Sequence, residues 1–532
     1  MTQRTQHTDV IIVGAGHNGL VAATMLARAG LRVTVVEERA VIGGATKTEY
    51  PFEKAPGLGT STASYLLGLM PPEIMARTGV KIDVIRRNPH YFLPMLDGRH
   101  LLLGTDHGAM REQFLAMFSE ADWHANGALA QELGQIRDDL APSWLEEPLS
   151  AHATAERYIR PTLREVFLNL VTGTVEDYLA RFGFESELLI AIYAVTDGFS
   201  GLSASFGTPG TGMNFLVHNM CRLPGADGTG MVARGGMGAV ANAFADAARS
   251  HGAEILVGSP VARIATTNGS ATGVVLADGR ELTANAIIVN ADPYRLREMV
   301  TRAALPGALN ARLDRCKRTG TTMKINMALS ELPTFTCLKE NRGQHNGTIH
   351  LLPQGEHPIA EICAGYERVA RGELAEFPTI EWYIHTQVDP SLRDAAGHHN
   401  SAFFVQWVPY ELAGRSWAQE ESRYVDHIIG IAERFCPGFR KTVVDTYTLT
   451  PPKIESEIGI RYGHIHHIDN TYGFDQRMPY ATGVAGLYSC SAGCHPAGSV
   501  IGAAGHNCAQ RVLVDLGVRA LAVGGPAGAA RG

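Results

Sequence analysis

A strand, a glycine-rich turn, a helix, a second strand and an acidic residue follow one another near the start of the chain, within residues 9–38. The apolar, largely β-branched residues 10–13 predict a strand buried on both faces. The turn after it reads Gly-x-Gly-x-x-Gly over residues 14–19, which lets backbone approach a pyrophosphate at the N-terminus of the helix expected over residues 20–29. After a second strand at residues 33–36, Glu37 is placed to accept hydrogen bonds from both ribose hydroxyls. This order and spacing predict a Rossmann-type dinucleotide site.

The residues after Glu37 extend the motif. Arg39 and the pair Gly43-Gly44 give Glu-x-Arg-x-x-x-Gly-Gly, in which the glycine pair lets the chain pass close to an extended dinucleotide. This pattern resembles the FAD-binding signature of amine oxidases and phytoene desaturases. For Arg39 alone, the alternative is a solvated surface arginine. No nicotinamide site is expected, because the glycines of residues 235–238 follow no buried strand and precede no ribose-binding acid.

The composition describes an ordinary globular protein. Of 532 residues, 45% are hydrophobic and 19% are charged, and the length predicts more than one domain. The net charge of -7 comes without a basic cluster, which argues against nucleic acid as a partner.

The cysteines and the apolar runs bear on location. The eight cysteines include no C-x-x-C, which argues against a thioredoxin-like dithiol and favours a reducing, cytoplasmic compartment over a secreted disulfide framework. Cys490 and Cys494 are expected to be small buried residues. The first ten residues lack the apolar segment of a secretory signal, and no run of 18 apolar residues predicts a membrane span. At most peripheral contact with a membrane is therefore expected.

Two later segments are expected to join the dinucleotide domain. In residues 233–289, a glycine turn and an alanine-rich helix precede strands that form a meander, with the backbone of Val261 beside the adenine or, alternatively, in a purely structural role. In residues 487–517, a strand and a glycine-containing turn precede a helix from about Val500, on which Gly502 and Gly505 leave a smooth face. The N-terminus of this helix would favour the flavin edge that becomes anionic on reduction.

The chain between these pieces predicts a second domain. Alternating strands are expected at residues 321–329, 379–386 and 402–408, and a helix at residues 423–435. Their aromatic residues could line a substrate pocket or form core; these are Trp382, Phe403, Phe404 and Trp407. We therefore predict an α/β fold: a discontinuous Rossmann-type FAD-binding domain (1–85, 226–300 and 456–517), an inserted mixed α+β substrate-binding domain (86–225 and 301–455) and a flexible tail (518–532).

Six segments, taken in order, carry a family resemblance. They are GAGHNGLVAA (14–23), SYLLGLMPPEI (64–74), GGMGA (235–239), NADP (290–293), RMP (477–479) and AGCHPAGSVIGAAGHNCA (492–509). Together they resemble the phytoene-desaturase-like FAD oxidoreductases, most of all the branch that contains pyridine nucleotide-disulfide oxidoreductase domain-containing protein 2. The resemblance implies FAD and redox chemistry, although the family also holds saturases and isomerases. Where many relatives carry three glycines after His-Pro, this chain has Ala497-Gly498-Ser499.

The candidate site residues come from all three pieces of the FAD domain. Those expected to hold FAD are Gly14, Ala15, Gly16, Asn18, Gly19, Glu37, Glu38, Arg39, Gly44, Val261, Gly493 and Gly502. His495 is the candidate catalytic base, because it lies in the turn expected to face the flavin and histidine exchanges protons near neutrality. A structural role in that turn is the alternative, and His464 and His467 are the other candidates. No metal site is predicted, because no carboxylate accompanies the histidines at facial-triad spacing.

Three functions stay open at this point. The first is an FAD-dependent oxidoreductase of desaturase or dehydrogenase type, which moves hydride between a lipophilic, isoprenoid- or fatty-acyl-like substrate and flavin N5 and uses oxygen or a quinone as electron acceptor. The second is a non-redox flavin-dependent isomerase of a polyene or lipid, and the third is a protein in which FAD stabilises a fold that binds partners. Leu66, Leu67, Leu69 and Met70 would form either an apolar lip for lipid entry or ordinary core. A homo-oligomer is also left open.

Overall fold

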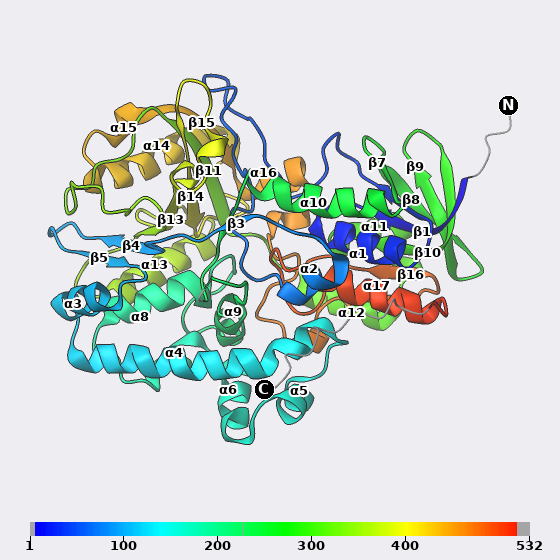
Figure 1. The fold of residues 1–532 in the computed structure, drawn as a ribbon, viewed down its shortest axis with the longest axis horizontal. Coiled ribbons are helices and arrows are strands. Elements are labelled where there is room, and N and C mark those ends of the chain that lie inside the picture. Colours follow the sequence, from blue (N-terminus) through cyan, green and yellow to red (C-terminus); the bar gives the residue numbers. More distant parts are fainter. Residues whose placement is uncertain (1–5, 227, 519–532) are drawn as a thin grey trace, which may run out of the picture.

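Two seven-stranded sheets form the two halves of the computed structural model, which describes residues 6–226 and 228–518 (Figure 1). The first sheet has the order β7-β2-β1-β10-β9-β8, with β16 paired to β10. Its strands are β1 (Gln6–Val13), β2 (Val33–Val36), β7 (Glu254–Leu256), β8 (Val261–Thr267), β9 (Ser270–Leu276), β10 (Glu281–Val289) and β16 (Leu487–Ser489). Five of these strands pair in parallel, in the order β7, β2, β1, β10 and β16, while β9 and β8 extend the sheet in antiparallel fashion. The residues of β2 and the second half of β1 are almost wholly apolar because parallel strands are buried on both faces.

Three helices pack side by side against this sheet. Helix α1 (His17–Arg28) contacts both α10 (Met237–Ser250) and α17 (Ala503–Asp515), which lie on either side of it (Figure 1). Gly505 makes the contact between α17 and α1 possible, since a Cβ atom there would stand 2.0 Å from the carbonyl oxygen of Asn18. The helix begins at Ala503, three residues later than expected, because Gly502 takes a left-handed φ of 78° as its N-cap.

The second sheet has the order β15-β11-β14-β13-β12-β4-β5. Its strands are β4 (Tyr91–Pro94), β5 (His100–Leu103), β11 (Thr322–Leu329), β12 (Thr348–Leu351), β13 (Thr379–Tyr383), β14 (His399–Gln406) and β15 (Val443–Leu449). All residues of β11, β13 and β14 are buried. One face carries Met323, Ile325 and Trp382 into a core shared with α14 (Trp417–Phe435). The opposite face is polar as well as buried, and it faces the first half of the molecule.

The remaining helices fill the sides of the two sheets (Figure 1). A short strand, β6 (Val232–Ala233), pairs with β3 (Val84–Ile85). The helices that precede β6 in the sequence are α2 (Pro72–Thr78), α3 (His107–Met117), α4 (Glu120–Leu140), α5 (Ala151–Tyr158), α6 (Arg164–Thr172), α7 (Val175–Ala180), α8 (Glu187–Tyr193) and α9 (Thr211–His218). After it come α11 (Pro293–Val300), α12 (Gly307–Cys316), α13 (Pro358–Ala370), α15 (Phe439–Thr442) and α16 (Pro451–Lys453).

The predicted fold class is confirmed, with a parallel Rossmann-type sheet and a mostly antiparallel second sheet. The domain boundaries themselves stay a prediction. One premise was wrong: a buried strand, β6, does precede Gly235, although it lies outside the Rossmann-type sheet. The tail predicted at residues 518–532 lies outside the described residues, apart from Val518.

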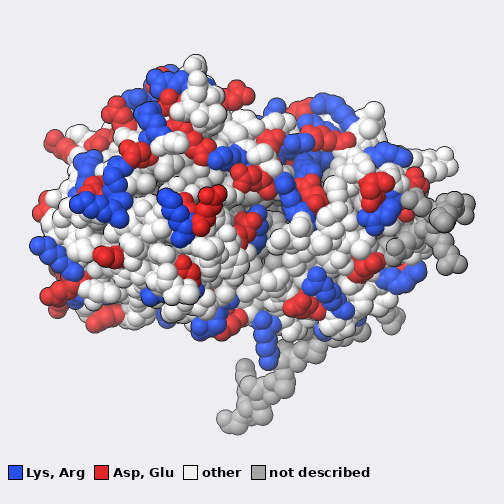
Figure 2. Space-filling view, turned by 90° about the horizontal axis from the view of Figure 1, so that it is seen from above, with Lys and Arg blue, Asp and Glu red and all other residues white. Residues whose placement is uncertain are grey.

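The surface, the helices and the cysteines of the described chain add three observations. On the face drawn in Figure 2, acidic and basic side chains interleave, and neither sign forms a continuous field. Within residues 6–226 and 228–518, no helix is both long and apolar enough to cross a bilayer. All eight cysteines are free, and Cys490 and Cys494 are buried as expected.

Candidate active site

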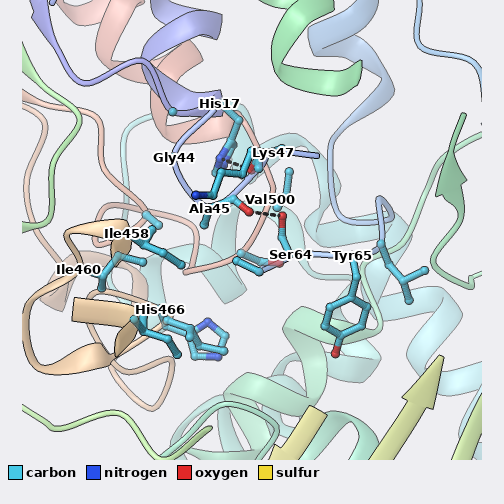
Figure 3. A pocket seen from close by; sticks show the side chains of 18 of the residues that line it. His17, Gly44, Ala45, Lys47, Ser64, Tyr65, Ile458, Ile460, His466 and Val500 are labelled. Carbon is cyan, nitrogen blue, oxygen red and sulfur yellow. Dashed lines mark hydrogen bonds between the residues drawn. The ribbon is translucent and has the colours of Figure 1, made fainter. Parts of the chain in front are cut away.

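A cavity of about 890 Å³ extends between the two sheets. At one end it is lined by the glycine-rich turn after β1 and the acid after β2, and at the other by side chains of β11, β12, β13 and β14. Figure 3 shows His17, Gly44 and Ala45 on one side of this space, His466 on another, and Tyr65 farther toward the strands of the second sheet. Its volume lies within the range of roughly 300–1,000 Å³ typical of ligand pockets.

Most residues predicted to hold the cofactor line the first end of the cavity. They are Gly14, Gly16, Asn18, Glu37, Glu38, Arg39, Gly44 and Val261. Gly19 does not reach the cavity; its role is close packing, because a Cβ atom there would stand 2.4 Å from the carbonyl oxygen of Gly14. Arg39 is exposed at the rim and donates from Nη2 to the carbonyl oxygen of Ser456 at 2.9 Å.

Glu37 is the buried carboxylate at the end of β2. Its two oxygens accept the backbone N–H groups of Ala15 at 2.8 Å and Arg39 at 2.9 Å. Burial raises the pKa of this carboxyl, and the two N–H donors oppose the rise. Ala15 therefore contributes through its backbone, which fixes Glu37 relative to the glycine turn.

Several buried polar atoms around the cavity have no hydrogen-bond partner within the described part of the chain. They are Nε2 of His17, Oδ1 of Asn18 and the Nδ1 atoms of His466 and His467. An unpaired buried polar group is costly, so such atoms indicate a polar ligand. Together with the close backbone approach of Gly14, Gly16 and Gly44, they fit a dinucleotide such as FAD.

The histidine predicted as catalytic base lies elsewhere. His495 is buried outside the cavity lining, with Nε2 3.0 Å from the carbonyl oxygen of Ser143 and its ring edge-on to Phe474. Burial lowers the pKa of His495 to about 4, which disfavours proton uptake at neutrality. This position favours the structural alternative for His495, and its catalytic role stays a prediction.

Of the other residues predicted or considered in the C-terminal segment, some line the cavity and some do not. Gly493 packs against Pro293, and Gly502 packs against Met70 and Ile74, so neither lines the cavity; Ser499 and Val500 do so instead. His464 is held by Asp469 at 3.2 Å outside the lining, whereas His466 and His467 border it. Within the described ranges, no three His, Cys, Asp or Glu side chains cluster as a metal site would require.

The leucine-rich segment is not an exposed lip. Leu67 and Met70 are fully buried, and Leu66 and Leu69 line the cavity. The core alternative therefore holds for Leu67 and Met70. Among the aromatic candidates, Phe404 lines the cavity, while Trp382, Phe403 and Trp407 belong to the core.

The far end of the cavity is lined by ionisable side chains that the sequence did not single out. Lys324 of β11 stands opposite Phe404 of β14, which stands opposite Glu381 of β13. All three line the cavity, with Lys324 and Glu381 about 10 Å apart at the usual strand spacing. One sequence pattern could have indicated this polar face: polar and apolar residues alternate along β11, so that Thr322, Lys324 and Asn326 share one side of the strand.

Lys324 is buried without a carboxylate partner within the described part of the chain. Its Nζ donates to the carbonyl oxygens of Ser61 at 2.6 Å and Ala63 at 2.7 Å, and it lies 4.4 Å from the ring centre of Tyr65. Burial lowers the pKa of Lys324 well below its ordinary value. A lysine amine that has released its proton can accept a proton from another group.

Glu381 is a buried carboxyl among tyrosines. The hydroxyl of Tyr383 donates to it, and that of Tyr65 lies 3.5 Å away. Burial raises the pKa of Glu381 to about 7. A carboxyl that titrates near neutrality inside a cavity is suited to proton transfer.

Comparison with known proteins places this site in a family. The model of flavin containing amine oxidoreductases matches residues 83–352, and that of NAD(P)-binding Rossmann-like domains matches residues 12–101. Pyridine nucleotide-disulfide oxidoreductase domain-containing protein 2 of Mus musculus is 33% identical over 555 residues, which cover 96% of this chain and 94% of that protein.

Two further comparisons agree. A lycopene-forming phytoene desaturase of a Paracoccus species is 26% identical over 527 residues, covering 95% of this chain and 97% of the desaturase. The solved structure of a wild-type putrescine oxidase bound to putrescine matches with a TM-score of 0.62 at 19% identity, over 97% of this chain and 100% of that one. The structural match shows a shared fold.

Proposed function

The chain belongs to the flavin-containing amine oxidoreductase family, in its phytoene-desaturase-like part, and we propose that it is an FAD-dependent desaturase or dehydrogenase. It would move a hydride between a carbon centre of a lipophilic substrate and flavin N5. The observation that carries the proposal is a single cavity that joins the dinucleotide motif to a buried group of proton-exchanging side chains. The homologous phytoene desaturase supports an isoprenoid-like substrate.

The first end of the cavity would hold FAD. Glu37 would accept hydrogen bonds from the ribose, and the turn from Gly14 to Gly16 would approach the pyrophosphate. His17 and His467 would offer their unpaired ring nitrogens to polar atoms of the cofactor. When bound, FAD supplies the ring system that takes or returns the hydride.

The second end would handle the proton. Removing hydrogen from two neighbouring carbons releases a hydride to the flavin and a proton to the protein. The Nζ of Lys324, whose pKa is lowered by burial, is the first candidate to accept that proton, and the carboxylate form of Glu381 is the second. Leu66, Leu69 and Phe404 would hold the apolar part of the substrate and exclude water.

The electrons must then leave the flavin. The strand before Gly235, β6, lies outside the Rossmann-type sheet, and no ribose-binding acid follows the helix after it. We therefore propose oxygen or a quinone as acceptor rather than a nicotinamide.

Anaerobic spectroscopy of the purified protein tests the proposal. We expect a yellow protein whose flavin absorption bleaches lastingly when a lipid extract is added and returns with oxygen or a quinone, with bleaching slowed in Lys324→Met. Conversion of a lipid without any net bleaching would instead identify an isomerase. A flavin that is bound but unaffected by lipids would favour an interaction protein, and a colourless protein that takes up NAD but not FAD would refute the proposal.

A further inference from the structure

Arg87, between β3 and β4, is a buried cation that lines the cavity. Its side chain is 6% exposed, and it borders the same end of the space as Glu381 and Tyr383. Its Nε donates to the carbonyl oxygen of Gly230, and its Nη1 donates to the hydroxyl of Thr348, both at 2.8 Å. Both acceptors are neutral, so these bonds orient the guanidinium without balancing its charge.

No carboxylate of the described residues lies within ion-pair distance of Arg87, whereas most other arginines of the protein are paired. Burial lowers the pKa of Arg87, and Tyr383, Cys221 and Glu381 oppose that shift, in that order. Glu381 is the carboxyl among these three, and its raised pKa of about 7 leaves it only partly charged at neutrality. A buried and unpaired cation is expensive to maintain because it has lost its hydration. Such a cation facing a cavity indicates an anionic ligand.

We propose that Arg87 binds the carboxylate of the substrate, so that the protein acts on a lipophilic carboxylic acid. This inference rests on the proposed function and names the class of substrate. A guanidinium matches the two oxygens of a carboxylate, and one positive charge balances one negative charge.

The position of Arg87 would set the orientation of such a substrate in the cavity. Its partner Thr348 belongs to β12, three strands away from β11, so the head group would sit about 14 Å from Lys324 along the sheet. The apolar chain would then extend past Leu69 and Phe404 toward Lys324 and the dinucleotide motif. The reacting carbons would therefore lie well away from the carboxylate.

Ligand titrations of the FAD-loaded protein test this inference. The probes are dodecanoate, methyl dodecanoate and dodecan-1-ol, which share a chain and differ in the head group. Perturbation of the flavin absorption spectrum and the shift in Tm report binding. The variants are Arg87→Met, which keeps the bulk and removes the charge, and Arg297→Met, which removes a half-buried arginine that is paired with Asp314 outside the cavity.

We expect wild type and Arg297→Met to bind dodecanoate roughly 10- to 100-fold more tightly than its methyl ester. Arg87→Met should bind all three probes alike, and without ligand its Tm should equal or exceed that of wild type, because the unpaired buried charge is gone. Equal affinity of wild type for acid and ester, or an acid preference that persists in Arg87→Met, would overturn the inference. Flavin content and the lipid-dependent bleaching measured on the same samples test the proposed function separately.

Discussion

Replacing Glu37 by glutamine is expected to weaken FAD binding strongly while the fold stays intact. Its two oxygens accept the N–H groups of Ala15 and Arg39 at 2.8 and 2.9 Å, and they border the cavity. A glutamine amide keeps one acceptor but turns an N–H group toward a second N–H donor. One of the two backbone N–H groups then loses its hydrogen bond, and a ribose hydroxyl loses a charged acceptor.

The size of the effect follows from these contacts. One hydrogen bond to a charged group is lost on binding, worth about 1–3 kcal/mol, which corresponds to roughly a 5- to 150-fold rise in the dissociation constant of FAD. Glu298→Gln is the matched control, because its carboxylate pairs with Arg461 outside the cavity lining, with 3.0 Å between Oε1 and Nε of the arginine. We expect loss of this partly exposed pair to leave the dissociation constant of FAD unchanged.

Titration of the flavin-free proteins with FAD, followed by flavin fluorescence, measures both constants. The Tm of each flavin-free variant shows whether the fold is retained. An unchanged constant in Glu37→Gln, or a larger effect in Glu298→Gln, would refute the assignment of Glu37 to the ribose.

Three further predictions concern the proton-exchanging groups. Lys324→Met should retain FAD but slow flavin reduction by about 10²–10⁴-fold in stopped-flow measurements, the usual contribution of general base catalysis; a wild-type rate would exclude Lys324 as the base. Glu381 has a folded-state pKa of about 7 against an ordinary 4.5, so the folded state binds its proton more tightly and its contribution to stability is lost as the pH rises from about 4.5 to 7. Unfolding free energies of wild type should therefore fall across this window by up to about 3 kcal/mol more than those of Glu381→Gln, and parallel curves would contradict the shift. His495→Gln should leave flavin reduction within about twofold of wild type while loss of the Ser143 contact lowers stability by about 1 kcal/mol, as chemical denaturation would show; a large loss of rate with intact FAD would restore His495 as a catalytic residue.

The dinucleotide end of the site could be predicted from the sequence because its physical requirements are local. A strand, a tight turn and a helix must follow one another within about 30 residues, so Gly14, Gly16 and Glu37 are recognisable by spacing alone. The same reasoning placed Val261 at the cavity, where the backbone crosses from β7 to β8.

The other end could not be predicted in this way. Lys324 and Glu381 lie on strands that are separated in the sequence and become neighbours of Phe404 only through sheet register. A polar face on an alternating strand ordinarily faces solvent, and only the packing of two sheets shows that this one is buried. The prediction for His495 relied on its closeness in sequence to Ser499 and Val500, which line the cavity. Sequence distance does not give side-chain direction, and the side chain of His495 points to Ser143.

The order of strands in the first sheet bears on how the protein is made. β1 pairs with β2 and β10, and β10 pairs with β16, so adjacent strands come from the start, the middle and the end of the chain. Such distant pairings slow folding, because long segments must be brought together before any contact forms. During synthesis, α1 has no partner on its α17 side until Gly505 has left the ribosome. A chain cut shortly before Leu487 would therefore expose the apolar flank of α1 and β10, and we expect it to be degraded or to aggregate rather than to accumulate as a smaller flavoprotein.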